Sequence, residues 1–144
     1  GFREGLEELG SPLPPQFYGQ VESFSHAGHA WGKVAAVRLL QLGTPPDAIF
    51  CVNDAIALGA IDGARSLGLR IPEDLWIVGY DDIELSSWDA YQLTTVRQPM
   101  SQMIERAISL LLARIDERDR PIAFECFANE LVIRQSTARA PMPP

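Results

Sequence analysis

The sequence lacks any run of about 18 apolar residues, the minimum length for a transmembrane helix, so we expect no membrane span and no membrane partner. Its first ten residues, GFREGLEELG, contain no initiator methionine, basic region or small-residue cleavage site, so they do not predict a signal peptide. They begin partway into a helical pattern, and we therefore expect the chain to be a fragment.

Basic residues are also scarce, with 12 Lys and Arg against 19 Asp and Glu and a net charge of −7. A protein that grips the phosphate backbone of DNA needs clustered Lys and Arg. Any role on DNA would therefore use another part of the protein.

Cysteine and histidine occur twice each. Cys51 and Cys126 both lie in apolar stretches, and we expect two buried free thiols rather than a disulfide. His26 and His29 are three residues apart, but no third ligand follows nearby, so we expect no metal site.

Several catalytic and nucleotide-binding motifs are absent from the sequence: G-x-S-x-G, H-E-x-x-H, G-x-G-x-x-G and the Walker loop. Their absence removes the standard signatures of serine hydrolases, zinc proteases and nucleotide-phosphate sites. We expect no catalysis and no cofactor.

The clearest structural unit is a strand, a helix and a second strand. AIFCV (48–52) and LWIVG (75–79) are continuous apolar runs, typical of strands covered on both faces. The segment 55–67 between them has apolar residues at helical spacing and stops at Gly68. This order predicts a βαβ unit with parallel strands, and hence an α/β fold.

The segment 99–115 has the most regular helical pattern, with an apolar stripe from Met100 to Ile115. Pro99 fits the first helical position, and the stripe predicts core packing, with a ligand groove as the alternative. The other predicted elements are a strand at 17–24, a helix at 26–42, an extended segment at 93–99 and one or two strands within 124–133.

Polar residues follow both strands of the βαβ unit: Asn53 and Asp54 after the first, Asp81 and Asp82 after the second. Parallel strands place these residues at one edge of the sheet, where open α/β sheets bind ligands. Amide and carboxylate groups suit a ligand with several OH or NH groups, such as a sugar or a nucleobase. The alternative is helix capping and turn formation, which Asn and Asp commonly provide.

The stretch from Ile49 to Glu84, followed by LTTVRQP and LVIRQST, resembles the effector-binding domain of the lac repressor (LacI/GalR) family of bacterial transcription regulators. The resemblance is nearly gapless from about Pro46 to Met100. It resumes over the following helix and LVIRQST, and GFREGLEELG is similar to the family's first helix in this region.

The resemblance implies an α/β fold of the type I periplasmic-binding-protein-like class, a parallel sheet with flanking helices, in incomplete form. Residues 1–95 would belong to the C-terminal subdomain. Residues 96–120 would form a crossing strand and a helix of the N-terminal subdomain, and 121–137 the returning strand. The tail 138–144 is expected to be disordered.

The family's effector contacts carry over to Asn53 and Asp81, which match positions that hydrogen-bond the effector. Gln98 and Met100 would lie at the cleft wall just past the crossing. Phe24 is the nearest candidate for the aromatic residue that stacks on the ligand in the family.

The resemblance also implies a homodimer with contacts from Leu58, Ile61 and Leu85. Asp82 is the family's usual second acid, and we interpret it as structural.

These expectations together predict the effector-binding and dimerisation part of a cytoplasmic transcription regulator that senses a small polar molecule such as a sugar. Operator DNA would be bound by a headpiece that is absent from this chain. The alternative is a periplasmic or ABC-type solute-binding protein of the same fold.

Overall fold

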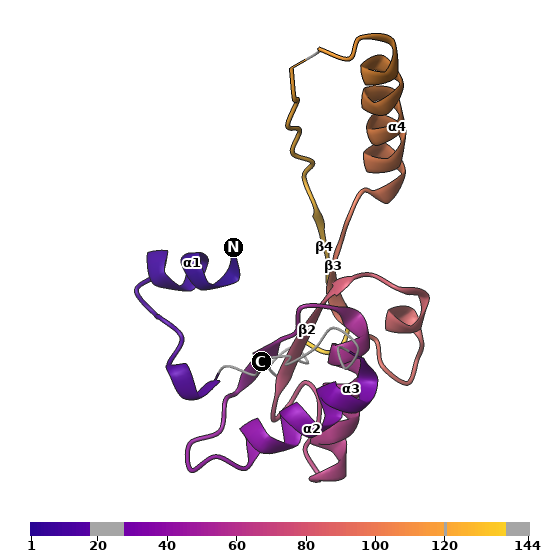
Figure 1. The fold of residues 1–144 in the computed structure, drawn as a ribbon. Helices are drawn as coiled ribbons and strands as arrows, with labels where there is room; N and C mark the ends of the chain where they lie inside the picture. Colours follow the sequence, from indigo (N-terminus) through magenta and orange to yellow (C-terminus); the bar gives the residue numbers. More distant parts are fainter. Residues whose placement is uncertain (18–27, 120, 138–144) are drawn as a thin grey trace, which may run out of the picture.

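The computed structural model describes residues 1–17, 28–119 and 121–137 of the chain (Figure 1). The elements in chain order are α1 (Phe2–Glu8), η1 (Pro15–Phe17), α2 (His29–Leu40), β1 (Ala48–Phe50), α3 (Asp54–Ser66), β2 (Trp76–Asp81), η3 (Glu84–Ser87), β3 (Thr94–Arg97), α4 (Met100–Asp116) and β4 (Glu130–Val132).

The four strands form one sheet in the order β1-β2-β3-β4. β1 pairs with β2 in parallel, with Ile49 opposite Ile77, so the predicted βαβ unit is confirmed. β2 also pairs with β3 in parallel, whereas β3 and β4 are antiparallel. The predicted parallel sheet is therefore a mixed sheet, because β4 returns along β3.

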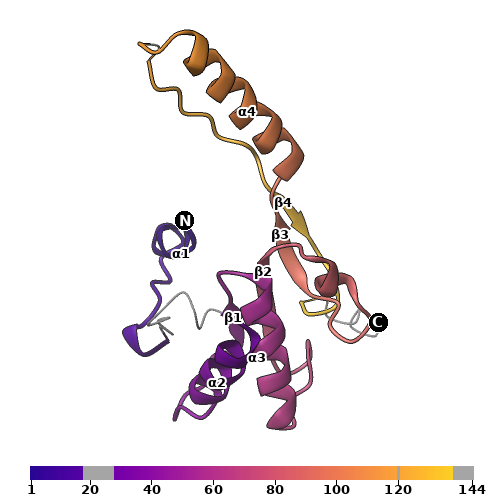
Figure 2. The same cartoon turned by 45° about the vertical axis from the view of Figure 1, so that its right-hand side comes forward.

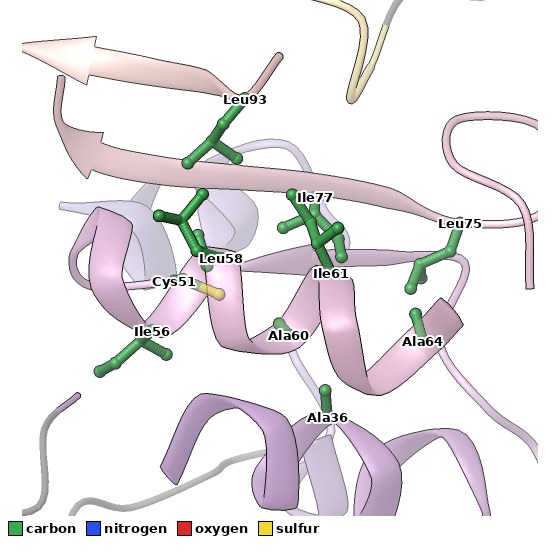
Figure 3. Packing of buried hydrophobic residues seen from close by; sticks show 11 residues of the cluster. Ala36, Cys51, Ile56, Leu58, Ala60, Ile61, Ala64, Leu75, Ile77 and Leu93 are labelled. Atoms are coloured by element: carbon green, nitrogen blue, oxygen red, sulfur yellow. The ribbon is translucent and has the colours of Figure 1, made fainter. Parts of the chain in front are cut away.

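The hydrophobic core lies around α3, which packs between the sheet and α2 (Figure 3). Leu58 and Ile61 are 2% and 0% exposed, on the side of α3 that faces the strands, where Ile77 and Leu93 are also buried. The assignment of Leu58 and Ile61 to a dimer interface is therefore corrected. Their side chains stabilise the fold of their own chain and leave no surface for a partner.

Helices α2 and α3 approach so closely that their contact requires glycine. A β-carbon placed on Gly59 would lie 2.0 Å from the carbonyl oxygen of His29, and one placed on Gly32 would lie 2.1 Å from that of Ile56. Real side chains do not tolerate such separations, so the backbones meet where no side chain intervenes.

The chain after β4 completes the middle of the sheet. Ser136 is 1% exposed, and its hydroxyl donates to the carbonyl of Ile77 at 2.6 Å while it accepts from the backbone N–H of Thr94 at 2.8 Å. Its backbone N–H donates to the carbonyl of Gln92 at 2.9 Å. One residue thereby joins the start of β2 to the start of β3.

α4 and the chain that follows it extend away from the sheet (Figures 1 and 2). Against the residues that the structure describes, no side chain of α4 is buried, and Ile108 and Leu111 of its apolar stripe are 53% and 61% exposed. The prediction that this stripe packs into the core is wrong for the described part of the chain, because α4 stands apart from the sheet.

Other boundaries differ in detail. Pro99 is the N-cap of α4 rather than its first residue. Only Glu130–Val132 of the predicted 124–133 strands is regular, and Cys126 is exposed because its segment runs beside α4, outside the core. The predicted buried thiol is confirmed for Cys51 alone.

Some predictions fall outside the described residues: most of the 17–24 strand, His26, Phe24 and the tail 138–144. Among the described helices, none is both long and apolar enough to cross a membrane.

Candidate functional site

Asn53 follows β1 at the carboxyl edge of the sheet and caps the helix that begins there. Its side-chain oxygen accepts a hydrogen bond from the backbone N–H of Ile56 at 2.9 Å. Such a bond satisfies one of the donors that a helix leaves unpaired at its start. The capping alternative is therefore confirmed for Asn53, and its contact with a ligand stays a prediction.

Asp54, the next residue, is fully buried and belongs to the fold. Its carboxylate accepts hydrogen bonds from the hydroxyls of Ser86 and Thr95, each at 2.6 Å, and from the backbone N–H of Ile83 at 2.9 Å. A β-carbon on Gly79 would lie 2.2 Å from Asp54 Oδ1, so glycine at position 79 leaves the room for this carboxylate. The carboxylate also lies in the first turn of α3, where the helix dipole favours negative charge.

Burial beside this carboxylate also affects Cys51. Its removal from water and the nearby charge of Asp54 raise the pKa of the Cys51 thiol to about 12. A thiol with such a pKa stays protonated at neutral pH and is a poor nucleophile. Cys51 is accordingly a core residue.

Asp81 ends β2 at the same edge and is exposed. Its Oδ1 accepts a hydrogen bond from Gln98 Nε2 at 2.8 Å, so the structure brings together two of the predicted site residues. The backbone of Asp81 has φ = 116°, which residues other than glycine rarely adopt. Such strain persists only where surrounding contacts enforce it, and it is concentrated at functional sites.

Asp82 has a different environment, with a side chain that is only 8% exposed. Its two oxygens accept separately from two arginines, Oδ2 from Arg97 Nε at 2.6 Å and Oδ1 from Arg134 at 2.7 Å. The backbone of Asp82 is left-handed, with φ = 56°, and the two ion pairs hold this turn in place. This arrangement agrees with the interpretation of Asp82 as the structural member of the pair.

The pKa of Asp82 reflects two opposing effects. Burial raises it, but the hydrogen bonds from Arg134 and then Arg97, with their charges, more than offset burial, and the pKa lies below its ordinary value. Since arginine stays protonated, the ionised carboxylate of Asp82 is favoured in the folded protein.

Acid is therefore expected to reduce the stability that Asp82 provides. Because its pKa is lower in the folded chain, its stabilisation is complete above the unfolded pKa and is lost as the pH falls through the folded pKa. We expect Asp82→Asn to cost about 2 kcal/mol above about pH 5, and progressively less below it. Urea denaturation of the wild type and of Asp82→Asn between about pH 7 and about pH 2 measures the difference in their unfolding free energies. A difference in unfolding free energy that stayed constant over this pH range would show that Asp82 does not stabilise the fold as an ionised carboxylate.

Of the other predicted residues, Met100 lies beside Gln98 and Leu85 lies on η3. Met100 is 51% exposed at the start of α4, and its backbone N–H donates to the carbonyl of Gln98 at 2.8 Å. Leu85 lies on η3 and is 39% exposed, so its dimer contact stays a prediction. Near it, Trp88 is 51% exposed.

The two arginines that bind Asp82 are not among the residues predicted from the sequence. One signal was available for Arg97, because pairing of β3 with β2 in parallel sets it opposite Asp81. Arg134 lies 52 residues from Asp82, and no local pattern connects them.

At the carboxyl edge of the sheet, the side chains of Asp81 and Gln98 can bind polar groups. A carboxylate accepts several hydrogen bonds and an amide both donates and accepts, so Asp81 and Gln98 can receive the hydroxyl or N–H groups of a small ligand. In the described residues, His, Cys, Asp and Glu side chains form no group of three or more that could hold a metal ion.

Comparison with known proteins gives a consistent result. Residues 1–137 match the family described as the periplasmic binding protein-like domain. The chain is 38% identical over 136 residues to the HTH-type transcriptional repressor PurR of Pasteurella multocida, covering 94% of this chain and 40% of that protein.

Solved structures agree with the sequence matches. A regulatory protein of the LacI family from Chloroflexus aggregans is similar with a TM-score of 0.83 and 29% identity, over 96% of this chain and 48% of that one. A transcriptional regulator CelR–cellobiose complex is similar with a TM-score of 0.81 and 28% identity, over 94% and 40%. The chain thus spans less than half the length of each of these three relatives.

Proposed function

The chain belongs to the family of periplasmic binding protein-like domains, in the form that LacI-family regulators carry, and we propose that it is part of the effector-binding domain of a bacterial transcription regulator. In this proposal the complete protein senses a small polar molecule and catalyses no reaction.

The observation that carries the proposal is the pair formed by Asp81 and Gln98. An exposed carboxylate in a strained turn, at the ligand-binding edge of an α/β sheet, is a ready acceptor for hydroxyl groups. The related CelR structure contains cellobiose, which supports a sugar as the first ligand class to test. Asn53 and Met100 complete the proposed contacts within the described residues, with Phe24 as a further candidate.

The domain layout is part of the proposal. Residues 1–95 would form most of the C-terminal subdomain, 96–120 would lead into the N-terminal subdomain, and 121–137 would return from it. Departure of the chain after β3 and its return at β4 support this division. Operator DNA would be bound by a headpiece outside this chain, in a cytoplasmic homodimer with Leu85 near the dimer interface.

A solute-binding protein of a transporter would use the same fold. The matched relatives are repressors and regulators, which favours regulation over transport.

In the complete protein, Asp81→Asn is expected to weaken the binding of its sugar or nucleobase ligand by at least about tenfold, because a neutral amide replaces a charged acceptor. Asparagine tolerates positive φ, so the backbone turn should persist. Isothermal titration calorimetry with a panel of mono- and disaccharides and nucleobases, first on the wild type and then on the variant, measures the change.

The matched control is Asp89→Asn, the same substitution at an exposed acid outside the candidate site. It should leave the titration unchanged, and operator binding by ligand-free protein should be unaffected in both variants. Equal affinities in wild type and Asp81→Asn would remove Asp81 from the site.

A further inference from the structure

We propose that Asp82 is a positioning residue, the pivot that sets the orientation of the α4 segment (residues 98–119 and 121–129) relative to the sheet. The chain leaves the sheet through Arg97, at the end of β3, and Arg134 lies just after β4, by which it returns. Both arginines bind the single carboxylate of Asp82, at 2.6 and 2.7 Å.

Arg97 extends the pivot to the returning strand itself. It pairs in register with Glu130 of β4, and its guanidinium also donates to the Glu130 carboxylate at 3.1 Å. A further contact at the crossing runs from Asn129 Nδ2 to the hydroxyl of Tyr80 at 2.9 Å. The two strands that carry the α4 segment are thereby fixed to the end of β2 by side-chain contacts as well as by the ladder.

The orientation of α4 depends on this crossing because, in the described part of the chain, the helix makes no extensive contact with the sheet. Both views show the α4 segment reaching away from the sheet from β3 and β4 (Figures 1 and 2). A change at the base of such a segment alters the position of its far end, as in a hinge.

The pivot is also adjacent to the proposed ligand site. Two consecutive acids, Asp81 and Asp82, are bound by two consecutive residues, Gln98 and Arg97. A ligand that binds Asp81 in place of Gln98 would break the Asp81–Gln98 contact directly before α4. The Asp82–Arg97 contact would remain and hold the base of the α4 segment. The release of Gln98 by a ligand rests on the proposed function. The role of Asp82 in orienting the α4 segment does not.

The test measures a distance without any ligand. In the complete protein with Cys126→Ser, nitroxide labels are attached at Arg38→Cys on α2 and Glu105→Cys on α4, both exposed positions. Labelled subunits are diluted with unlabelled ones so that double electron–electron resonance reports intrachain distances. The measurement is repeated with Asp82→Asn and with Arg97→Gln, a milder change because the Arg97 side chain is 47% exposed.

Both variants are expected to broaden and shift the distance distribution while circular dichroism shows that they remain folded. The control is Asp74→Asn, which breaks an aspartate–arginine pair with Arg70 (2.7 and 2.9 Å) away from the crossing and should leave the distribution unchanged. If folded Arg97→Gln gave the wild-type distance distribution, the proposal that Asp82 orients the α4 segment would be wrong. This conclusion would hold for any result obtained with Asp82→Asn. Failure of the ligand-binding proposal would instead appear only in the Asp81→Asn titrations.

Discussion

The Asp54→Ala variant is expected to lose about 4 kcal/mol of unfolding free energy, since hydrogen bonds to charged groups contribute about 1.5–3 kcal/mol each and act together here. The substitution removes the acceptor of three donors, the backbone N–H of Ile83 and the hydroxyls of Ser86 and Thr95. All three donors would stay near the core without their partner, and the start of α3 would lose a favourable charge.

Urea denaturation followed by circular dichroism measures this loss. The matched control is Asp62→Ala, the same change in the same helix at a side chain that is 33% exposed. We expect that control to cost less than about 1 kcal/mol, because Asp62 keeps contact with water and its hydrogen-bond partner His29 is also exposed. Similar losses at the two positions would show that the buried carboxylate has no special role.

A double-mutant cycle with Gly79→Ala tests the same packing in another way. Alanine at this position would collide with Asp54 Oδ1, at 2.2 Å, and approach Leu93 to 2.9 Å. Removing the carboxylate relieves the first contact, so Gly79→Ala should cost less in the Asp54→Ala background than in the wild type. If the losses of stability from Gly79→Ala and Asp54→Ala were additive, the two residues would not be in contact.

The second large effect is expected for Gly59→Ala, with a loss of about 3 kcal/mol from overpacking. Helix propensity alone would favour alanine by about 1 kcal/mol, so the two effects have opposite signs. The close approach decides the outcome, because the new methyl group would lie 2.0 Å from the carbonyl oxygen of His29 and 2.9 Å from the backbone nitrogen of Lys33. Backbone atoms of α2 can yield only if the whole helix moves.

Gly5→Ala provides the matched control for Gly59→Ala. Gly5 also lies within a helix, α1, but a β-carbon there meets nothing within 4 Å. We expect no loss of stability, and thermal unfolding of the two variants compares them directly. A Gly59→Ala protein as stable as the wild type would show that α2 and α3 are not packed backbone to backbone.

The sequence predicts the βαβ unit well because continuous runs of apolar, β-branched and aromatic residues favour a strand. AIFCV contains β1, and LWIVG contains the first four residues of β2. The predicted burial on both faces is wrong, because no residue of β1 is buried and only Ile77 and Gly79 are buried in β2. The α4 stripe is equally clear in the sequence but exposed in the structure. Periodicity identifies the apolar face of a helix and contains no information about the surface that covers it.

The roles of the acidic residues at the ends of β1 and β2 also depend on contacts that the local sequence does not contain. Asp54 comes after β1 and Asp81 ends β2, yet Asp54 is fully buried and Asp81 is exposed with φ = 116°. Adjacent carboxylates look alike in sequence, and their roles depend on partners far along the chain, such as Arg134 for Asp82. The assignment of Leu58 and Ile61 to a dimer interface follows from the family resemblance alone, and it is wrong because the sheet covers both side chains.

The position of Ser136 has a consequence for the order in which the protein can fold. This residue is synthesised after everything it joins, and it contacts Ile77 and Thr94 across separations of 59 and 42 residues. Contacts between such distant residues form late because long loops must close first. During synthesis, β1, α3 and β2 can associate as soon as they leave the ribosome, whereas the gap between the starts of β2 and β3 stays open until the α4 segment has emerged.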